Sequence, residues 1–444
     1  MKVLLIALNY KTMKASQYLY IIPYDSARTI IFCGTTRRFM RLNQESFESV
    51  ALILKNPESY KDTHPNLLKT LKRNGFVIDD DVNETDMLSL ARNEFVNSPT
   101  YKTTILTTYD CNYKCWYCIQ THVTEKVSAK KIARIVKHVK TYLIENDIKE
   151  YVLSWFGGEP LMEPEMIDTV SQELYKFCKE NNIKYHGAIT TNGSLLTDKT
   201  IEILYKNHID HYQITIDGDK ENHDKTKRQE GEESSFETIL NNIVALLNRN
   251  ERAEISLRFN YTPKSLKSPT LVDDVNSIIP APLRNRISVD FHKVWQIDEH
   301  IISIDELASM LMKFHKSGYK ICSDHVFSIC YVDKLHHNMI YYNGGVDKCD
   351  NHDIPHLRGY IDSDGHIIWK ERPIINDVDI LAEGNCCRYC HYYPVCYGCC
   401  PVKREEDIIK NGKMICKYEG HFDIFEHRIL DYCVREMISN DIEL

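Results

Sequence analysis

Between about residues 100 and 300, short runs of β-branched and apolar residues alternate with longer segments whose apolar residues recur at helical spacing. We expect strands at 103–109, 151–156, 185–191, 211–217, 254–261 and 287–294. We expect helices near 128–146, 163–181, 197–207, 235–249, 269–279 and 303–318. Strands that alternate with helices predict an α/β fold with a parallel, helix-covered sheet. In such folds the chemistry belongs at the C-terminal ends of the strands.

The first 95 residues predict a small α+β unit. Two extended runs, 18–23 and 28–33, precede helical patterns at 44–55 and 64–74. Gly75 follows the second helix as a natural C′ residue, and a returning strand is expected directly after it.

The composition is that of an ordinary globular protein: of 444 residues, 43% are apolar and 27% are charged, and the formal net charge is −8. This length predicts two or three domains. The absence of a basic excess argues against nucleic acid as the main partner. The apolar run at residues 3–8 is too short for a signal peptide or a membrane span, so we expect a cytosolic protein. In a cytosolic chain, sixteen cysteines point to metal rather than disulfides.

Three cysteines follow the first strand of the alternating region. Cys111, Cys115 and Cys118 have Cys-x3-Cys-x2-Cys spacing. Thiolates are the usual ligands of a [4Fe–4S] cluster, and three ligands for four irons would leave one iron open to a substrate or cofactor. A zinc site is the alternative, with His122 as the fourth ligand that structural zinc normally has.

This spacing is also the signature of the radical S-adenosylmethionine (SAM) enzymes, which the stretch resembles closely. The resemblance implies a partial (β/α)6 TIM barrel and a cluster whose open iron chelates the amino and carboxylate groups of SAM. One electron from the cluster then splits SAM into methionine and a 5′-deoxyadenosyl radical. Tyr117 stands where the family carries an aromatic residue beside the adenine.

The ends of the next two strands carry further motifs of that family. Gly157, Gly158 and Glu159 resemble the motif that receives the SAM amino group, because glycines permit close backbone approach and a carboxylate can receive an ammonium group. Thr191 and Asn192 lie in a Thr-Asn-Gly sequence that resembles the lining of the SAM pocket. The alternatives are a turn before a helix for the first motif and a left-handed turn for the second.

Two later strands add candidate residues. By the resemblance, Thr215 meets the SAM ribose or carboxylate and Arg228 meets the carboxylate. Lys227 is the rival for the second role if the loop is one residue longer than usual. Asn260 ends the fifth strand, where inward polar groups are expected. Arg258 accompanies it there, and an ordinary surface arginine is the alternative. The residues placed to face a peptide substrate by position alone are His292, Lys293 and Gln296.

Eleven of the sixteen cysteines lie at or beyond residue 322. Their spacing matches the seven-cysteine SPASM domain that follows radical SAM cores acting on peptides. By that pattern, two auxiliary [4Fe–4S] clusters are held by Cys330, Cys349 and Cys400, with Cys322 as our candidate fourth ligand, and by Cys387, Cys390, Cys396 and Cys416. Two zinc sites are the structural rival. Two cysteines beside assigned ligands, either of which could displace a neighbour by one position, are Cys386 and Cys399.

Two other features bear on the substrate. Asp350 follows Cys349 directly, where sulfatase-maturing relatives place an acid that takes the substrate proton, although a turn aspartate needs no such role. The N-terminal unit weakly resembles winged-helix modules that hold the leader peptides of ribosomally made natural products as an added strand. Six basic residues could face an acidic peptide or form a solvated surface: Arg37, Arg38, Arg41, Lys69, Lys72 and Arg73.

These patterns predict a leader-recognition-like unit at 1–95, a radical SAM core at 100–318 and a SPASM domain at 319–444. The resemblance implies an enzyme with SAM and three [4Fe–4S] clusters that abstracts hydrogen from a precursor peptide and installs a thioether or carbon–carbon crosslink. It also implies a flavodoxin- or ferredoxin-type electron donor. A sulfatase-type formylglycine-forming maturase is the nearest alternative, and a zinc-braced peptide-binding scaffold is the non-enzymatic one.

Overall fold

The chain folds into two compact units. The computed structural model describes residues 12–125, 127–228, 231–294, 296–297, 303–323, 326–350, 357–375 and 378–442, so the apolar run at 3–8 lies outside the described residues. Unit 1 comprises Met1–Val96, Val326–Ile329 and Asp377–Cys433. Unit 2 comprises Asn97–His325, Cys330–Asn376 and Val434–Leu444. The units are interleaved along the chain, and residues of the predicted C-terminal domain belong to both.

Unit 2 is built on an eleven-stranded sheet with the order β12-β11-β10-β9-β8-β7-β6-β13-β14-β15-β16. Its central strands run parallel, from β12 to β13. They are β6 (Thr100–Leu106), β7 (Glu150–Phe156), β8 (Lys184–Thr191), β9 (Ile209–Ile216), β10 (Glu254–Tyr261), β11 (Ile287–Lys293), β12 (Lys320–Ile321) and β13 (His337–Tyr341). An antiparallel extension follows: β14 (Gly345–Asp347), β15 (Gly359–Ile361) and β16 (Ile367–Trp369). The predicted α/β fold with a partial barrel-like parallel sheet is confirmed.

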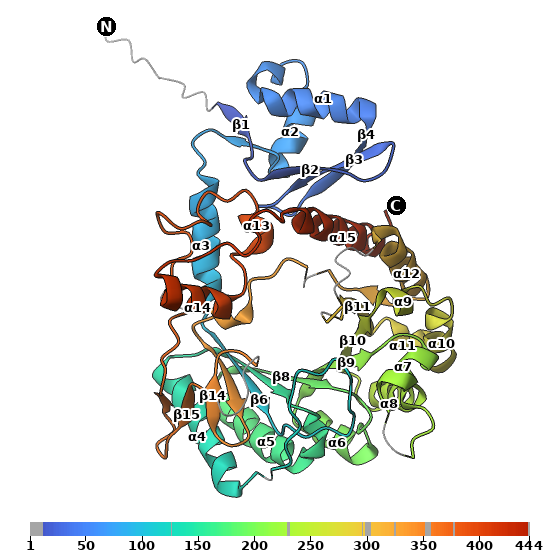
Figure 1. Ribbon diagram of the computed structural model, residues 1–444, viewed down its shortest axis with the longest axis vertical. Coiled ribbons are helices and arrows are strands. Elements are labelled where there is room, and N and C mark those ends of the chain that lie inside the picture. The colour runs from blue at the N-terminus through green and yellow to red at the C-terminus, as the bar shows by residue number, and fades with distance from the viewer. Residues whose placement is uncertain are drawn as a thin grey trace. The chain divides into compact units, whose positions relative to one another are not determined.

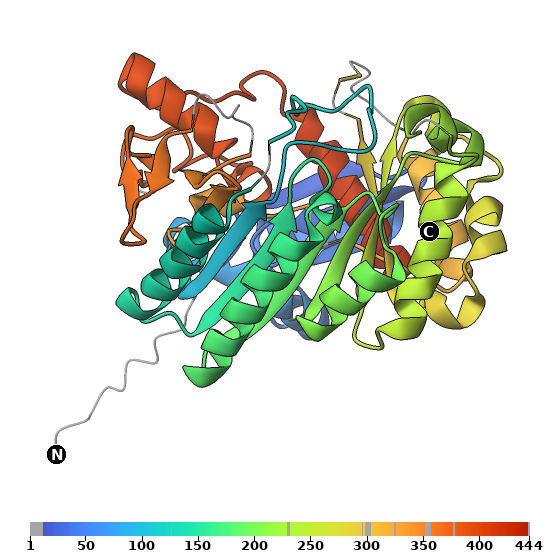
Figure 2. The ribbon, with the colours of Figure 1, turned by 90° about the horizontal axis from the view of Figure 1, so that it is seen from below.

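Helices cover one face of this sheet, as Figures 1 and 2 show for the helices that follow β6, β7 and β8. The helices between the strands are α4 (Ala129–Glu145), α5 (Pro164–Glu180), α6 (Asp198–Lys206), α7 (Lys220–Thr226), α8 (Ser235–Arg249), α9 (Pro263–Leu266), α10 (Leu271–Ile278), α11 (Ala281–Arg284) and α12 (Ile304–Lys316). Alternation along β7 explains the packing. Tyr151, Leu153 and Trp155 are fully buried, and the Trp155 indole donates to the Ser171 hydroxyl of α5 at 3.1 Å. Residues between them face the opposite side, where the functional site forms.

Unit 1 combines two small sheets with helices. β1 (Met13–Ala15) pairs with β5 (Val77–Asp79), and β2 (Leu19–Pro23), β3 (Arg28–Cys33) and β4 (Phe39–Asn43) form an antiparallel sheet. Its helices are α1 (Gln44–Lys55), α2 (Pro65–Arg73), α3 (Glu84–Val96), α13 (Tyr393–Cys396), α14 (Pro401–Asn411) and most of α15 (Asp423–Ser439). Ile31, Val50, Leu71 and Phe76 form the core of the N-terminal part. The sequence analysis predicted α1 and α2 but missed β4 and α3.

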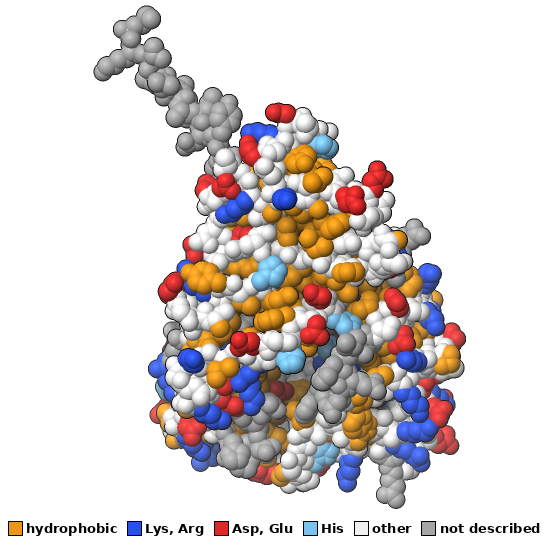
Figure 3. Space-filling view, turned by 45° about the horizontal axis from the view of Figure 1, so that its top comes forward, with side chains coloured by type: hydrophobic (Ala, Val, Ile, Leu, Met, Phe, Trp, Pro, Cys, Tyr) orange, Lys and Arg blue, Asp and Glu red, His pale blue; other side chains and the backbone are white. Residues whose placement is uncertain are grey.

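The surface carries both signs of charge. On the face shown in Figure 3, lysine and arginine side chains are interspersed with aspartate and glutamate, without a basic band. Among the described residues, every helix is too short or too polar to span a bilayer.

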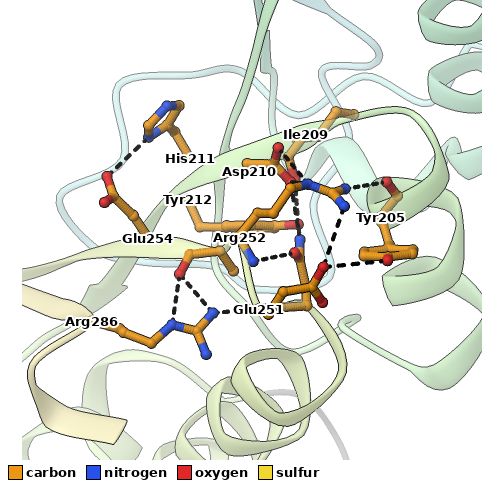
Figure 4. A network of polar contacts seen from close by, with 11 residues as sticks. Tyr205, Ile209, Asp210, His211, Tyr212, Glu251, Arg252, Glu254 and Arg286 are labelled. Carbon is orange, nitrogen blue, oxygen red and sulfur yellow. Dashed lines mark hydrogen bonds and ion pairs between the residues drawn. The ribbon is translucent and has the colours of Figure 1, made fainter.

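A polar network joins the N-terminal ends of the central strands in unit 2, opposite the functional edge (Figure 4). The Arg286 guanidinium, just before β11, donates to the carbonyls of Leu247 at 2.7 Å and Ala253 at 2.9 Å, and to that of Asn250. These carbonyls lie at the end of α8 and in the turn to β10, where they lack helical partners. Arg252 pairs with Asp210 of β9 at 3.0 Å. The network therefore stabilises this end of the sheet.

We predict that Arg286→Met destabilises unit 2 by about 2 kcal/mol, because three carbonyls lose a shared charged donor. The thermal unfolding midpoint should then fall by about 4–8 °C. Arg249→Met is the matched control on α8. Its guanidinium makes an exposed ion pair with Asp198 at 2.9 Å, so its loss should change the midpoint by about 2 °C or less. Equal midpoints for the two variants would contradict this assignment.

Candidate active site

A cavity of about 320 Å³ opens at the C-terminal ends of the parallel strands of unit 2. This volume is within the usual range for small-molecule sites. The C-terminal ends of β7 to β11, and the loops after β6 to β9 and β11, form its walls. They supply Cys111, Tyr113, Cys115, Tyr117, Cys118, Ile119, Gln120, His122, Phe156, Gly157, Gly158, Thr190, Thr191, Asn192, Thr215, Lys227, Arg258, Asn260, Lys293, Val294 and Gln296. Most of the predicted SAM-site residues are therefore brought together around one space.

The three cysteines of the first motif lie together on one wall. The Asp110 carboxylate shapes their loop by accepting from the Cys111 N–H and from the Thr124 hydroxyl. Burial raises the pKa of the Cys111 and Cys115 thiols to about 11, so these thiols keep their protons unless a cation replaces them. Three thiols on one wall of a cavity fit the ligand set of an iron–sulfur cluster, which Cys111, Cys115 and Cys118 would hold.

His122, the ligand of the zinc alternative, also lines the cavity, and its Nε2 lies 3.9 Å from Cys118 Sγ. In the described part of the chain, no three His, Cys, Asp or Glu side chains form a group that could hold one metal ion.

Two glycines allow the loop after β7 to lie against the cysteine loop. The Gly158 N–H donates to the Thr108 carbonyl, and the Glu159 N–H donates to the Asp110 carbonyl, both at 2.9 Å. A Cβ at Gly158 would lie 2.1 Å from the Asp110 oxygen, and one at Gly157 would lie 2.5 Å from the Thr108 oxygen. Gly157 also has a φ of +143°, which other residues rarely adopt. Only glycine fits this approach.

The Glu159 side chain does not line the cavity, although its motif suggested a contact with the SAM amino group. Its carboxylate is fully buried and accepts from the Thr191 hydroxyl at 2.7 Å, the Asn192 N–H at 2.8 Å and the Leu161 N–H at 3.0 Å. Burial raises the pKa of this carboxyl, and the hydrogen bonds oppose that shift. Its carboxylate thus binds the next loop of the protein, while the backbone of Gly157 and Gly158 lines the cavity.

Tyr117 is held by residues from two strand ends. Its hydroxyl donates to the Asp217 carboxylate at 2.7 Å and accepts from the Asn260 amide at 3.2 Å. Arg258 Nε donates to Asn260 Oδ1 at 3.1 Å. Burial raises the pKa of both Tyr117 and Asp217. Asp217 completes this network, although the sequence analysis gave it no role of its own.

Lys227, and not Arg228, enters the cavity. The helix α7 ends at Thr226, and its C-cap Lys227 turns inward with a side chain only 4% exposed. Lys227 Nζ donates to the Thr215 carbonyl at 3.0 Å and lies 3.5 Å from Asp217 Oδ1. Arg228 is exposed and lines no part of the cavity. The structure thus favours the rival that the loop length suggested.

The cysteines assigned to the second auxiliary cluster also meet. Cys387, Cys390, Cys396 and Cys416 line one pocket within unit 1. Cys386 and Cys399, the two unassigned cysteines, line it as well. The pocket is therefore lined by more thiols than one cluster needs. Cys399 is among them because residues 397–399 all have positive φ, which turns this side chain inward.

Cys322, Cys330 and Cys349, three of the four cysteines assigned to the first auxiliary cluster, belong to unit 2, and Cys400 belongs to unit 1. The buried Lys348 Nζ donates to the carbonyls of Lys334 at 2.7 Å and His337 at 2.9 Å, which holds the segment of Cys349 against the one that follows Cys330. Asp350 accepts from the Tyr331 hydroxyl at 3.3 Å and lies 3.8 Å from the Cys349 thiol. Asp350 does not line the cavity at the ends of the strands.

Comparison with known proteins shows what this chain is similar to. Residues 105–252 match the radical SAM superfamily. The serine-type anaerobic sulfatase-maturating enzyme of Bacteroides thetaiotaomicron is 28% identical over 225 residues, which are 48% of this chain and 47% of that enzyme, so the chain matches about half of its length. The radical SAM cyclopropyl synthase TigE of Paramaledivibacter caminithermalis is 23% identical over 375 residues, 73% and 72% of the two chains. The solved structure of native anSMEcpe with bound AdoMet and Cp18Cys peptide has the same fold, with a TM-score of 0.53 and 15% identity over 78% of this chain and 100% of that one.

We predict that Gly158→Ala disrupts the cysteine loop, since its Cβ would overlap the Asp110 carbonyl. After anaerobic reconstitution with iron and sulfide, this variant should hold about four irons fewer per chain than the natural protein, the content of one cube. Gly384→Ala is the control, because a Cβ there meets nothing within 4 Å and costs only the strain of a positive φ. Full iron loading of Gly158→Ala would show that the close approach is not required.

Proposed function

We propose that this protein, which carries a radical SAM domain, is a maturase that oxidises a peptide, and that it installs a crosslink in a ribosomally made precursor. One observation carries the proposal: three cysteines converge with the glycine, asparagine and threonine motifs around a single cavity at the C-terminal edge of the sheet. A cluster bound there supplies an open iron for SAM and the electron that cleaves it to a hydrogen-abstracting radical.

The chain's own residues bind and orient SAM in this proposal. The backbone of Gly157 and Gly158 receives the methionine end beside the cysteines, because no side chain intervenes there. The Lys227 ammonium faces the carboxylate of SAM, as a point charge from the floor of the cavity. Tyr117, fixed by Asp217 and Asn260, presents its ring to the adenine. Thr191, Asn192 and Thr215 complete the polar wall.

The auxiliary sites would remove the second electron. Four cysteines of one pocket, Cys387, Cys390, Cys396 and Cys416, suit a fully ligated [4Fe–4S] cluster, and Cys322, Cys330 and Cys349 are proposed for the other. The Asp350 carboxylate, beside Cys349, is proposed as the base that takes the substrate proton. A flavodoxin or ferredoxin is the proposed reductant for the SAM cluster.

A peptide substrate is supported by the relatives, which include a sulfatase maturase and a cyclopropyl synthase. Sulfatase maturation is an equally good second candidate, since the first relative is named for it. The N-terminal unit favours a leader-guided peptide. Among the described residues, β4 is an edge strand of the β2–β3–β4 sheet, so a strand can add at this edge, where Arg41 lies. Two other basic candidates are engaged within unit 1: Lys72 with Asp79, and Arg37 with the Tyr397 hydroxyl.

A panel of peptides separates the two candidates. It contains sulfatase segments carrying cysteine or serine, and short precursors encoded beside the gene, with and without their leaders. A formylglycine product carries an aldehyde that a hydrazine reagent traps, whereas a crosslink gives no such adduct. Modification of a precursor only when its leader is present would support the proposal. Formylglycine in the sulfatase segments would replace it with the second candidate.

We predict that Cys115→Ala abolishes 5′-deoxyadenosine formation from SAM under dithionite, because its cluster loses a ligand. Iron should fall from about twelve to about eight per chain. Cys390→Ala should lose a similar amount of iron and all modified peptide but still form 5′-deoxyadenosine. Cys178→Ala removes a buried thiol of α5 and should leave all three readouts unchanged. Peptide modification by Cys115→Ala, or zinc without iron in the natural protein, would refute the radical mechanism.

We also predict that Lys227→Met raises the KM for SAM by about 10- to 100-fold, the value of one hydrogen bond to a charged group. Lys227→Arg should recover part of the loss, because it keeps the charge. Arg228→Met should behave like the natural protein, since its side chain is exposed. The KM for SAM is measured from initial rates of 5′-deoxyadenosine formation over a range of SAM concentrations. The reverse order of effects would return the role to Arg228.

A further inference from the structure

We propose that Arg258 binds a carboxylate of the peptide substrate and so positions the segment that the radical attacks. The inference rests on the proposed function and deepens it, because it names the chemistry by which the peptide is recognised. That peptide carries an acidic side chain, or its own C-terminal carboxylate, close to the position that is modified. The inference concerns a cavity side chain to which SAM binding assigns no role.

The alternation along β10 directs Arg258 into the cavity. Leu257 and Phe259 are fully buried on the face that the helices cover, and the Phe259 ring packs on Phe314 of α12 with centroids 5.2 Å apart. Because side chains of a strand alternate between its two faces, Arg258 and Asn260 point to the other face. Both of them line the cavity. Arg258 is therefore a partly buried residue of the cavity wall and not an ordinary surface arginine.

Only one part of the Arg258 guanidinium is used within the protein. Its Nε donates to Asn260 Oδ1 at 3.1 Å, and this is the one side-chain hydrogen bond that Arg258 makes to any described residue. The two Nη groups remain able to donate, and together they form the planar fork that binds a carboxylate through two hydrogen bonds. Burial lowers the pKa of this guanidinium and the Asp290 carboxylate opposes that shift, but an arginine keeps its charge at neutral pH.

The carboxylates nearest to Arg258 in the sheet interact with other cations. Asp290, the residue of β11 that pairs with Arg258, lies 3.9 Å from the buried Arg435 guanidinium. Asp217, after β9, lies 3.5 Å from Lys227 Nζ. Within the described ranges, no carboxylate comes within ion-pair distance of the Arg258 guanidinium. A bound molecule can therefore supply the anion that this arginine lacks.

The charge of the cavity favours an acidic peptide. Among the described residues that line it, three are lysine or arginine, namely Lys227, Arg258 and Lys293, and none is aspartate or glutamate. SAM brings one carboxylate, which we have proposed for Lys227, and its sulfonium and ammonium groups leave it a net cation. SAM therefore supplies no second anion for Arg258. A peptide carboxylate does, and water competes less for such a pair in a partly buried site than on an open surface.

Arg258 lies across the sheet from the cysteine loop. That loop follows β6, and β7, β8 and β9 separate β6 from β10. Adjacent strands are about 4.8 Å apart, so β6 and β10 are about 19 Å apart along the sheet. A carboxylate at Arg258 thus holds the peptide on the side opposite the SAM cluster, with the radical formed between them. Half of this distance is about three residues of extended chain, which places the acidic group about that far from the modified position.

The test compares peptides that differ in one carboxylate. The starting peptide is the one of the panel that the natural enzyme modifies, whether a precursor or a sulfatase segment. Each Asp or Glu within about three residues of the modified position is replaced in turn by Asn or Gln. A further copy carries a C-terminal amide, which separates a side-chain carboxylate from a terminal one. The KM for each peptide is measured with the reconstituted natural enzyme, Arg258→Gln and Arg249→Gln, and the KM for SAM is measured without peptide.

One amide peptide should have a KM about 10- to 100-fold higher than the starting peptide with the natural enzyme, the value of one hydrogen bond to a charged group. Arg258→Gln should raise the KM for the starting peptide by a similar factor, with a change of about twofold or less in the KM for SAM. This variant should no longer distinguish the two peptides, because each change removes the same pair. Arg249→Gln, which removes an exposed ion pair with Asp198 on α8, should keep the natural discrimination.

The inference would be overturned if Arg258→Gln still preferred the starting peptide to its amide form, or if every carboxylate of the peptide could be replaced without loss. A rise in the KM for SAM as large as the rise for peptide would overturn it in favour of SAM binding. Loss of iron or of thermal stability in Arg258→Gln would overturn it in favour of a structural role. If the natural enzyme forms no deoxyadenosine or modifies no peptide of the panel, the proposed function fails first and the inference with it.

Discussion

The buried carboxylate of Glu159 fixes the loops at three neighbouring strand ends. Its side chain accepts three hydrogen bonds, among them those from Thr191 at the end of β8 and from Asn192 directly after it. The N–H of Glu159 donates to the Asp110 carbonyl of the cysteine loop after β6. Removing a carboxylate from water costs several kcal/mol, which charge-assisted hydrogen bonds offset only when their geometry is good. Because these bonds converge from separate loops, the positions of Cys111, Gly158 and Asn192 around the cavity depend on one another.

Local sequence patterns were sufficient to predict the positions of most longer strands and helices of unit 2. Each of the six predicted strands and six predicted helices lies within a few residues of an observed one, because apolar alternation and helical spacing report which face of a segment is buried. The short elements β12, β13, α7, α9 and α11 were not predicted. Local patterns carry no information about which strands pair. β13 lies parallel to β6, with His337 opposite Lys102, although more than 200 residues separate them. The same limit explains why β4 was missed: Phe39–Asn43 acquires its strand by pairing with β3.

At the site, the sequence identified residue types correctly where a backbone requirement selects them, as at Gly157 and Gly158. The sequence did not decide which of two adjacent residues of similar chemistry points into the site. Lys227 and Arg228 are adjacent cations, and only the end of α7 decides which of them turns inward. Cys399 and Cys400 pose the same problem, since the left-handed backbone from Tyr397 to Cys399 directs the first of them into the pocket. Motif spacing gives only the number of residues between two positions, whereas helix ends and positive φ angles determine where a side chain points.

Two of the histidine–carboxylate pairs of unit 2, His211–Glu254 and His292–Asp290, illustrate how position changes the behaviour of similar groups. His211 and Glu254 have side chains 55% and 65% exposed, so water competes for both partners and screens their attraction. Asp290 is almost wholly buried between His292 and Arg435, so little water competes for its carboxylate. The carboxylate therefore holds the His292 imidazole in one orientation. Parallel strands expose different ends to different environments: their N-terminal ends are tied by Arg252 and Arg286, and their C-terminal ends enclose the cavity. At the C-terminal ends, burial therefore fixes the geometry of a polar pair that water loosens at the N-terminal ends.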